Sequence, residues 1–184
     1  MHITLSWDLF IIVFFAVIIT YSFIIGMKES VKVIIASYIG IVAVQGLGNL
    51  LGFVAHPDDP LLQSLGFSLD VTMLAIIKLV LLIATIIFLS IKSGLDVQYI
   101  KQSSPVTSGA VTGIFGFATA GLLLSTVLTY MAGVPLLDTT LMKSAALSPL
   151  MSQSTLMGLM VNYQDAWFAL PAFLLIGVGF LNNR

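Results

Sequence analysis

Few residues of this chain could do chemistry, and their positions argue against catalysis. The two histidines, His2 and His56, fall outside the apolar runs, and the chain of 184 residues contains no cysteine. The sequence therefore offers no thiolate nucleophile, no cysteine-based metal site and no serine–histidine dyad within an apolar run. The adjacent Asp58 and Asp59 are flanked by prolines, a pattern more typical of a turn than of acid–base catalysis. We predict a protein that is not an enzyme and that uses no cofactor or metal.

One ionisable residue, Lys78, lies inside an apolar run and is the sharpest candidate for a functional site. A charge at such depth is expensive and usually faces a partner, a cavity or the interior of a helix bundle. Gln45, Asn49 and Thr126 lie at similar depths in their own runs, so the four could form a polar layer. This layer would serve as a permeation or binding site, or as a contact between subunits. The alternative is a lysine whose side chain extends back to the lipid headgroups beside Asp70.

The composition places these residues in a membrane. Hydrophobic residues make up 59% of the chain and charged residues only 8%, and the mean hydropathy is +1.11. Average soluble domains carry roughly a quarter charged residues, so this chain cannot cover a water-facing surface. Seven basic and eight acidic residues give a net charge of −1 and no basic patch for nucleic acid. A soluble domain, a disordered chain and a nucleic-acid-binding protein are therefore excluded.

Apolar runs of membrane-crossing length predict an all-α polytopic membrane protein, with residues 1–184 forming a single membrane domain. A span needs roughly 20 residues, and backbone groups in lipid must bond within their own segment, which requires helices. A fifth run is shorter and contains Pro171; we favour a fifth span, and a re-entrant helix is the alternative. Segment 134–164 is too polar to span and should hold short helices in the outer interface. The predicted spans are residues 8–27, 32–55, 70–91 and 108–133, with 166–181 as the short fifth.

The positions of the basic residues predict the orientation. Lys28 and Lys32 occupy the first connection and Lys92 and Lys101 the third, whereas the second connection has no basic residue. Basic loops stay on the cytoplasmic side, so the N-terminus would lie outside and, with five spans, the C-terminus inside. The first connection is short enough to form a corner between two antiparallel helices. Glu29 and Lys32 can pair at this corner, at a spacing of three residues.

Glycines recur where helices could approach each other closely. Lipid provides no hydrophobic drive between helices, so their association depends on the close packing of small residues. Two pairs have the G-x-x-x-G spacing, one in each of two predicted spans. A tight bundle or a contact between subunits would use them, and the alternative is the general enrichment of glycine in membrane helices. The packing candidates are Gly48, Gly52, Gly109, Gly113 and Gly116.

Three stretches of the chain share features with one family of bacterial membrane proteins. Trp7-Asp8 precedes the first apolar run, Gly26 is followed by Met27-Lys28-Glu29, and spaced glycines occupy residues 108–116. In these features the chain resembles the CvpA family, named for colicin V production, although it lacks the Asp-Arg pair that often precedes the glycines. The resemblance implies a non-enzymatic inner-membrane protein of envelope maintenance and export, with Asp8 and Gly26 as family-like positions.

The residues and the resemblance lead to three hypotheses of function. The first is an inner-membrane protein of the CvpA type that works, within membrane lipid, as an oligomer or an assembly partner. The second is a small channel or transporter subunit in which the polar layer around Lys78 lines a hydrated path. The third is an accessory subunit of a larger membrane complex, which nothing in the sequence separates from the first.

Overall fold

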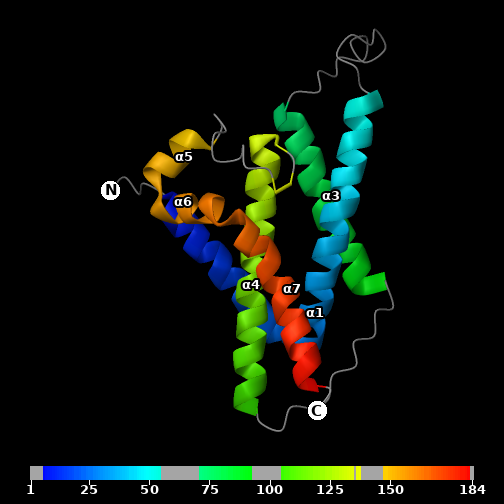
Figure 1. Cartoon of the computed structure of the whole chain (residues 1–184), viewed down its shortest axis with the longest axis vertical. Coiled ribbons are helices and arrows are strands. Elements are labelled where there is room, and N and C mark those ends of the chain that lie inside the picture. The colour runs from blue at the N-terminus through cyan, green and yellow to red at the C-terminus, as the bar shows by residue number, and fades with distance from the viewer. Residues whose placement is uncertain (1–5, 55–70, 93–104, 135, 138–146, 183–184) are drawn as a thin grey trace.

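The computed structural model describes residues 6–54, 71–92, 105–134, 136–137 and 147–182, and no residue in these ranges belongs to a strand. Figure 1 shows α4 at the centre of a bundle, with α1, α3 and α7 around it. The prediction of an all-helical protein is confirmed. The helices are α1 (Trp7–Val54), α3 (Val71–Lys92), α4 (Pro105–Ala132), α5 (Ser148–Gln153), α6 (Thr155–Asn162) and α7 (Gln164–Asn182).

Three described helices are long and apolar enough to cross a membrane, as a membrane protein requires. Their candidate stretches are Trp7–Leu50, Met73–Lys92 and Thr107–Ala132. The pair α6 and α7 would make a fourth, but its two helices are bent by 67° relative to each other. The predicted spans at 70–91 and 108–133 agree with α3 and α4 to within three residues. Pro105 begins α4, a position where the missing amide of proline costs no helical hydrogen bond.

The helix α1 is broken at Gly26. This glycine has φ 80° and ψ 173°, a backbone conformation essentially restricted to glycine. The break separates a first arm, residues 7–25, from a second arm, residues 27–54, and Figure 1 shows the two arms running in opposite directions. At about 1.5 Å per residue the arms are about 29 and 42 Å long, comparable with or longer than a hydrocarbon core of roughly 30 Å.

The prediction of a corner at Lys28–Lys32, between helices 8–27 and 32–55, is wrong by a few residues. Lys28 to Lys32 are helical, and the chain reverses direction at Gly26 instead. Lys32 Nζ lies 2.8 Å from Glu29 Oε1, so the pairing that the spacing predicts is present inside the second arm. The charged residues fall near the corner, but only glycine can adopt the backbone angles that make it.

Successive long elements alternate in direction (Figure 1). The first arm, α3 and the α6–α7 pair run toward the end of the bundle that contains Gly26, and the second arm and α4 run away from it. The contact between Gly48 and Lys78 fixes the antiparallel register of the second arm and α3. In this register Lys92, the last residue of α3, lies level with Lys32. The second arm and α3 therefore each carry a lysine at the end of the pair nearest Gly26.

The polar segment 134–164 contains two short helices, as its composition predicts. These helices are α5 and α6, and they lie beside the start of α1 in Figure 1. Residues 138–146 of the segment lie outside the described part of the chain. The predicted fifth span, 166–181, corresponds to α7, which continues through Pro171.

Replacing Gly26 with alanine should destabilise the fold, because a Cβ strains the backbone in this conformation. We expect the free energy of unfolding to fall by about 1–3 kcal/mol. Titration with SDS in mixed micelles, followed by circular dichroism, measures it. Gly46→Ala is the matched control, because a Cβ at this position of the second arm meets no atom within 4 Å. Equal stability of the two variants would show that the corner does not depend on the glycine.

Candidate functional site

The helix α4 is far more buried than the other long helices. In its most apolar stretch 67% of the residues are buried, against 11% in α1 and 6% in α3. Thr112, Thr119 and Thr126, spaced by seven residues, are buried along α4. Each of their hydroxyls donates to the carbonyl four residues earlier, over 2.7–2.8 Å. These three threonines therefore place hydroxyl groups inside the bundle with their hydrogen bonds made, whereas the buried hydroxyls of Ser125 and Tyr130 on the same helix have no partner among the described residues.

Two glycines of α4 allow neighbouring helices to come close. A Cβ on Gly116 would lie 3.0 Å from the Ile19 Cα and 2.9 Å from the Ser22 Cβ of the first arm. A Cβ on Gly121 would lie 2.1 Å from Cε3 of Trp167, in α7. The first arm and α7 thus lie against α4 at positions where α4 has no side chain.

The other predicted packing glycines have different surroundings. A Cβ on Gly113 would lie 3.0 Å from Cζ of Phe23, whereas a Cβ on Gly109 would meet no atom within 4 Å. Gly48 lies against the side chain of Lys78 rather than against a backbone. The surroundings of Gly52 lie outside the described residues. The spacing alone does not indicate which glycine meets another helix, because that depends on where the helix axes cross.

The side chain of Lys78 extends from α3 across Gly48 of the second arm and toward the Tyr130 ring of α4. Its Cε lies 2.4 Å from the position of a Cβ on Gly48, and its Nζ lies 5.6 Å from the centre of the Tyr130 ring. Tyr130 is in the last turn of α4, about 3 Å along the axis from the end at Ala132. The Lys78 ammonium group thus lies beside the last turn of α4 but at the level of Gly48, six residues before the end of the second arm.

Two further residues of the predicted polar layer lie at this contact. Gln45 and Asn49 are one turn apart on the second arm, on either side of Gly48, and Gln45 Nε2 donates to Asn49 Oδ1 over 3.1 Å. The Gln45 Oε1 atom is buried and has no hydrogen-bond partner. The structure therefore places Gln45 and Asn49 on the helix face that Lys78 crosses.

Thr126 occupies a different kind of position from the other three. It is fully buried, and its hydroxyl donates to the Leu122 carbonyl over 2.8 Å. Tyr130, one turn further along α4, stacks with Lys78 instead, and its own hydroxyl is buried without a partner. The sequence analysis did not select Tyr130 for this site, because only the crossing of α3 and α4 brings its ring to the lysine.

Two apolar grooves flank the C-terminal half of α4, and both are lined by Val127 and Met131. The larger, the α1–α4–α6 groove, measures about 450 Å³, and the smaller, the α3–α4 groove, about 310 Å³. Ser6, Trp7, Phe10, Leu124, Leu128 and Met157 complete the larger groove, and Ala75, Ile76, Leu79 and Tyr130 complete the smaller one.

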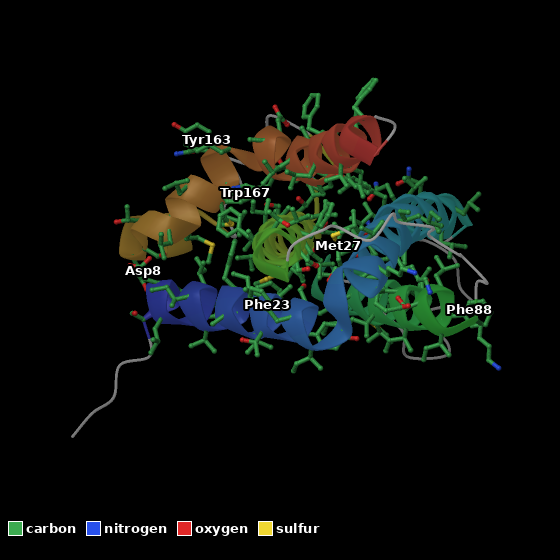
Figure 2. The ribbon with its side chains drawn as sticks, turned by 90° about the horizontal axis from the view of Figure 1, so that it is seen from below. Asp8, Phe23, Met27, Phe88, Tyr163 and Trp167 are labelled. Atoms are coloured by element: carbon green, nitrogen blue, oxygen red, sulfur yellow. The ribbon has the colours of Figure 1, made fainter. Side chains whose placement is uncertain are left out.

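Asp8 connects the start of α1 to the N-terminus of α6. The Ser154 hydroxyl and the Leu156 amide donate to Asp8 Oδ1 over 2.5 and 3.1 Å. Ser154 is itself the N-cap of α6, because its Oγ accepts from the Met157 amide over 3.0 Å. A carboxylate at this position satisfies an otherwise free amide and interacts favourably with the positive end of the helix dipole. Figure 2 shows Asp8 at the point where the two elements meet.

Aromatic side chains hold the start of α7 against α4. The Trp167 ring lies between α7 and α4 in Figure 2, with ring centres 5.9 Å from Phe15 and 5.5 Å from Phe117. The Gln164 amide donates to the Thr129 hydroxyl over 2.8 Å, and both groups are buried.

A polar contact joins the second arm of α1 to α7 near Pro171. Proline removes the amide that would bond the carbonyl four residues earlier and distorts the helix there. The Tyr38 hydroxyl donates to the adjacent Phe168 carbonyl from the second arm of α1. The packing of α7 therefore depends on residues far apart in the sequence.

Comparison of the chain with known protein families, with curated proteins and with solved structures gives no match. Within the described ranges, no three histidine, cysteine, aspartate or glutamate residues gather as metal ligands. The function is therefore argued from the geometry of the grooves and of the contacts around Lys78 and Asp8.

Replacing Gly116 with alanine should separate the first arm of α1 from α4. The added Cβ would meet the backbone at Ile19, which cannot rotate away, and such overpacking costs about 1–3 kcal/mol. SDS titration in mixed micelles measures the change. Gly109→Ala is the control on the same helix, since open space surrounds that position. A Gly116→Ala variant as stable as the control would exclude a close contact at this point.

Replacing Asp8 with alanine should release α6 from α1. The loss of two hydrogen bonds to a charged acceptor should lower the free energy of unfolding by about 1.5–3 kcal/mol. Hydrogen exchange at the Leu156 and Met157 amides should also become faster. Asp165→Ala, an exposed carboxylate in the first turn of α7, is the control. Unchanged exchange at both amides in Asp8→Ala would contradict the capping role.

Proposed function

We propose that this chain is a non-enzymatic multi-pass protein of the bacterial inner membrane, resembling the CvpA family, that acts as an oligomer or an assembly partner in envelope maintenance and export. The proposal includes five membrane crossings, formed by the first arm, the second arm, α3, α4 and the bent α6–α7 pair. The N-terminus then lies outside and the C-terminus in the cytoplasm.

The distribution of lysines supports this orientation. Lys28 and Lys32 begin the second arm just after Gly26, and Lys92 ends α3 at the same level. The described part of α7 also ends near this end of the bundle (Figure 1). An end rich in lysine belongs on the cytoplasmic side.

The observation that carries an assembly role is the α1–α4–α6 groove. It is a depression of about 450 Å³ in the apolar surface, lined by residues of α1, α4 and α6. Trp7 and Phe10 contribute aromatic side chains, and the exposed Met131 contributes a flexible thioether that adapts to different partners. In lipid, helices associate through close van der Waals packing rather than through the hydrophobic effect. A grooved apolar surface is therefore suited to bind a helix of another subunit.

The structure gives less support to a hydrated path through the polar layer. A path requires free polar groups that face a common channel. The Thr126 hydroxyl is bonded within its own helix, and the Lys78 side chain packs on Gly48 and Tyr130. We therefore place the assembly role before the channel role.

The assembly role is tested by native mass measurement after extraction in a gentle detergent. We expect the wild-type protein to retain a mass above that of the monomer, either as a multiple of its own mass or with foreign subunits at fixed stoichiometry. Phe10, 42% exposed in the groove, is the position to change. Phe10→Gln should weaken association about tenfold, the effect of losing an aromatic contact worth about 1.4 kcal/mol.

Phe173→Gln is the matched control. Phe173 is also an exposed phenylalanine, and it lies on α7, away from the groove. A wild-type protein that stays monomeric while lipid remains bound would overturn the proposal. Equal loss of association in both variants would show that the groove is not the contact surface. Self-multiples would indicate an oligomer, and foreign subunits an assembly partner or accessory subunit.

A further inference from the structure

We propose that the α3–α4 groove and Lys78 together bind one anionic phospholipid of the surrounding bilayer. The phosphate lies at the Lys78 ammonium group, and an acyl chain occupies the groove. The proposal depends on membrane insertion of α3 and α4 but not on the assembly role.

The first argument is the unpaired charge. Lys78 is the only charged residue in α3 apart from the terminal Lys92. Its ammonium group forms no ion pair or hydrogen bond within the described part of the chain, and it lies 5.6 Å from the centre of the Tyr130 ring. An ammonium group that is partly removed from water needs an anion. Because the group lies near the level of the α4 end, that anion is available in the headgroup region of the bilayer.

The second argument is the apolar groove that adjoins this charge. Its walls are the side chains of Ala75, Ile76 and Leu79 on α3 and of Val127, Tyr130 and Met131 on α4. Its volume of about 310 Å³ lies at the lower limit of small-molecule sites, roughly 300–1,000 Å³. An apolar groove open to the membrane fits a single hydrocarbon chain.

Tyr130 joins the two parts of the site. Its ring lines the groove and also lies beneath the Lys78 ammonium group. On α3, Ala75 and Leu79 of the groove wall lie within one helical turn of Lys78. A phosphate at the lysine is therefore within reach of a chain in the groove, as in one phospholipid molecule.

A neutral donor lies close to the proposed phosphate position. Asn49 is exposed and follows Gly48, against which the Lys78 side chain packs. Its Oδ1 accepts from Gln45, so its Nδ2 remains able to donate. Hydrogen bonds from such donors orient a phosphate whose charge is balanced by a lysine.

The experiment uses the full chain in nanodiscs of zwitterionic phosphatidylcholine with a minor fraction of phosphatidylglycerol. Native mass spectrometry after release from the nanodisc counts the phospholipids that remain on the protein. We expect one retained phosphatidylglycerol. Lys78→Gln should lower its retention about fivefold, as expected for the loss of one lysine contact near the membrane surface.

Two matched controls separate a specific site from general effects. Lys92→Gln removes the same charge from the other end of α3 and should leave retention unchanged. Ile76→Trp fills the groove and should also reduce retention, whereas Ile83→Trp adds the same bulk to an exposed position two turns away. Circular dichroism establishes that each variant is folded, and only folded variants are compared.

Several outcomes would overturn the proposal. Equal retention by Lys78→Gln and the wild type would remove the lysine from the site. An equal decrease in Lys92→Gln would indicate only general attraction of basic residues to anionic lipid. A dimer without retained phosphatidylglycerol would indicate that a second copy occupies the groove. A wild-type protein that retains no phosphatidylglycerol but keeps an oligomeric mass would overturn the lipid site and leave the assembly role intact.

Discussion

Close contact along the small residues of α4 is the constraint on which the rest of the structure depends. Within a bilayer the apolar side chains of a helix gain little by leaving lipid for a neighbouring helix, so the bundle relies on van der Waals contact. Such contact requires that the helix axes come close, which Gly116 and Gly121 permit toward the first arm of α1 and toward Trp167.

Polar contacts fix the elements that packing alone would leave poorly held. The short helices α5 and α6 contain six and eight residues, too few to be stable in isolation. Asp8 and Ser154 satisfy the free amides at the start of α6, and Gln164 anchors the beginning of α7 to Thr129. An unpaired polar group is costly where water is excluded, so each of these bonds also favours one arrangement of the chain over its alternatives.

The two ends of the bundle differ in ways that bear on function. The end near Gly26 carries Lys28, Lys32 and Lys92 on regular helices, and Lys32 pairs with Glu29. The opposite end carries two apolar grooves, the Lys78–Tyr130 contact and the α6 segment held by Asp8. Because lipid and partner subunits both meet the protein through its apolar surface, this opposite end is the one equipped to distinguish among them.

The sequence alone determined that the protein is helical and apolar, where α3 and α4 lie, and that Lys78 is exceptional. These properties depend on composition and on the length of apolar runs, which each segment carries by itself. The exact corner at Gly26, the pairing of Asp8 with Ser154 and the stacking of Lys78 on Tyr130 were decided only by the tertiary structure. The last two are contacts between residues distant in the sequence, and they depend on where and at what angle the helices cross. The corner at Gly26 is set by the backbone angles of that one residue. No spacing within a single segment contains that information.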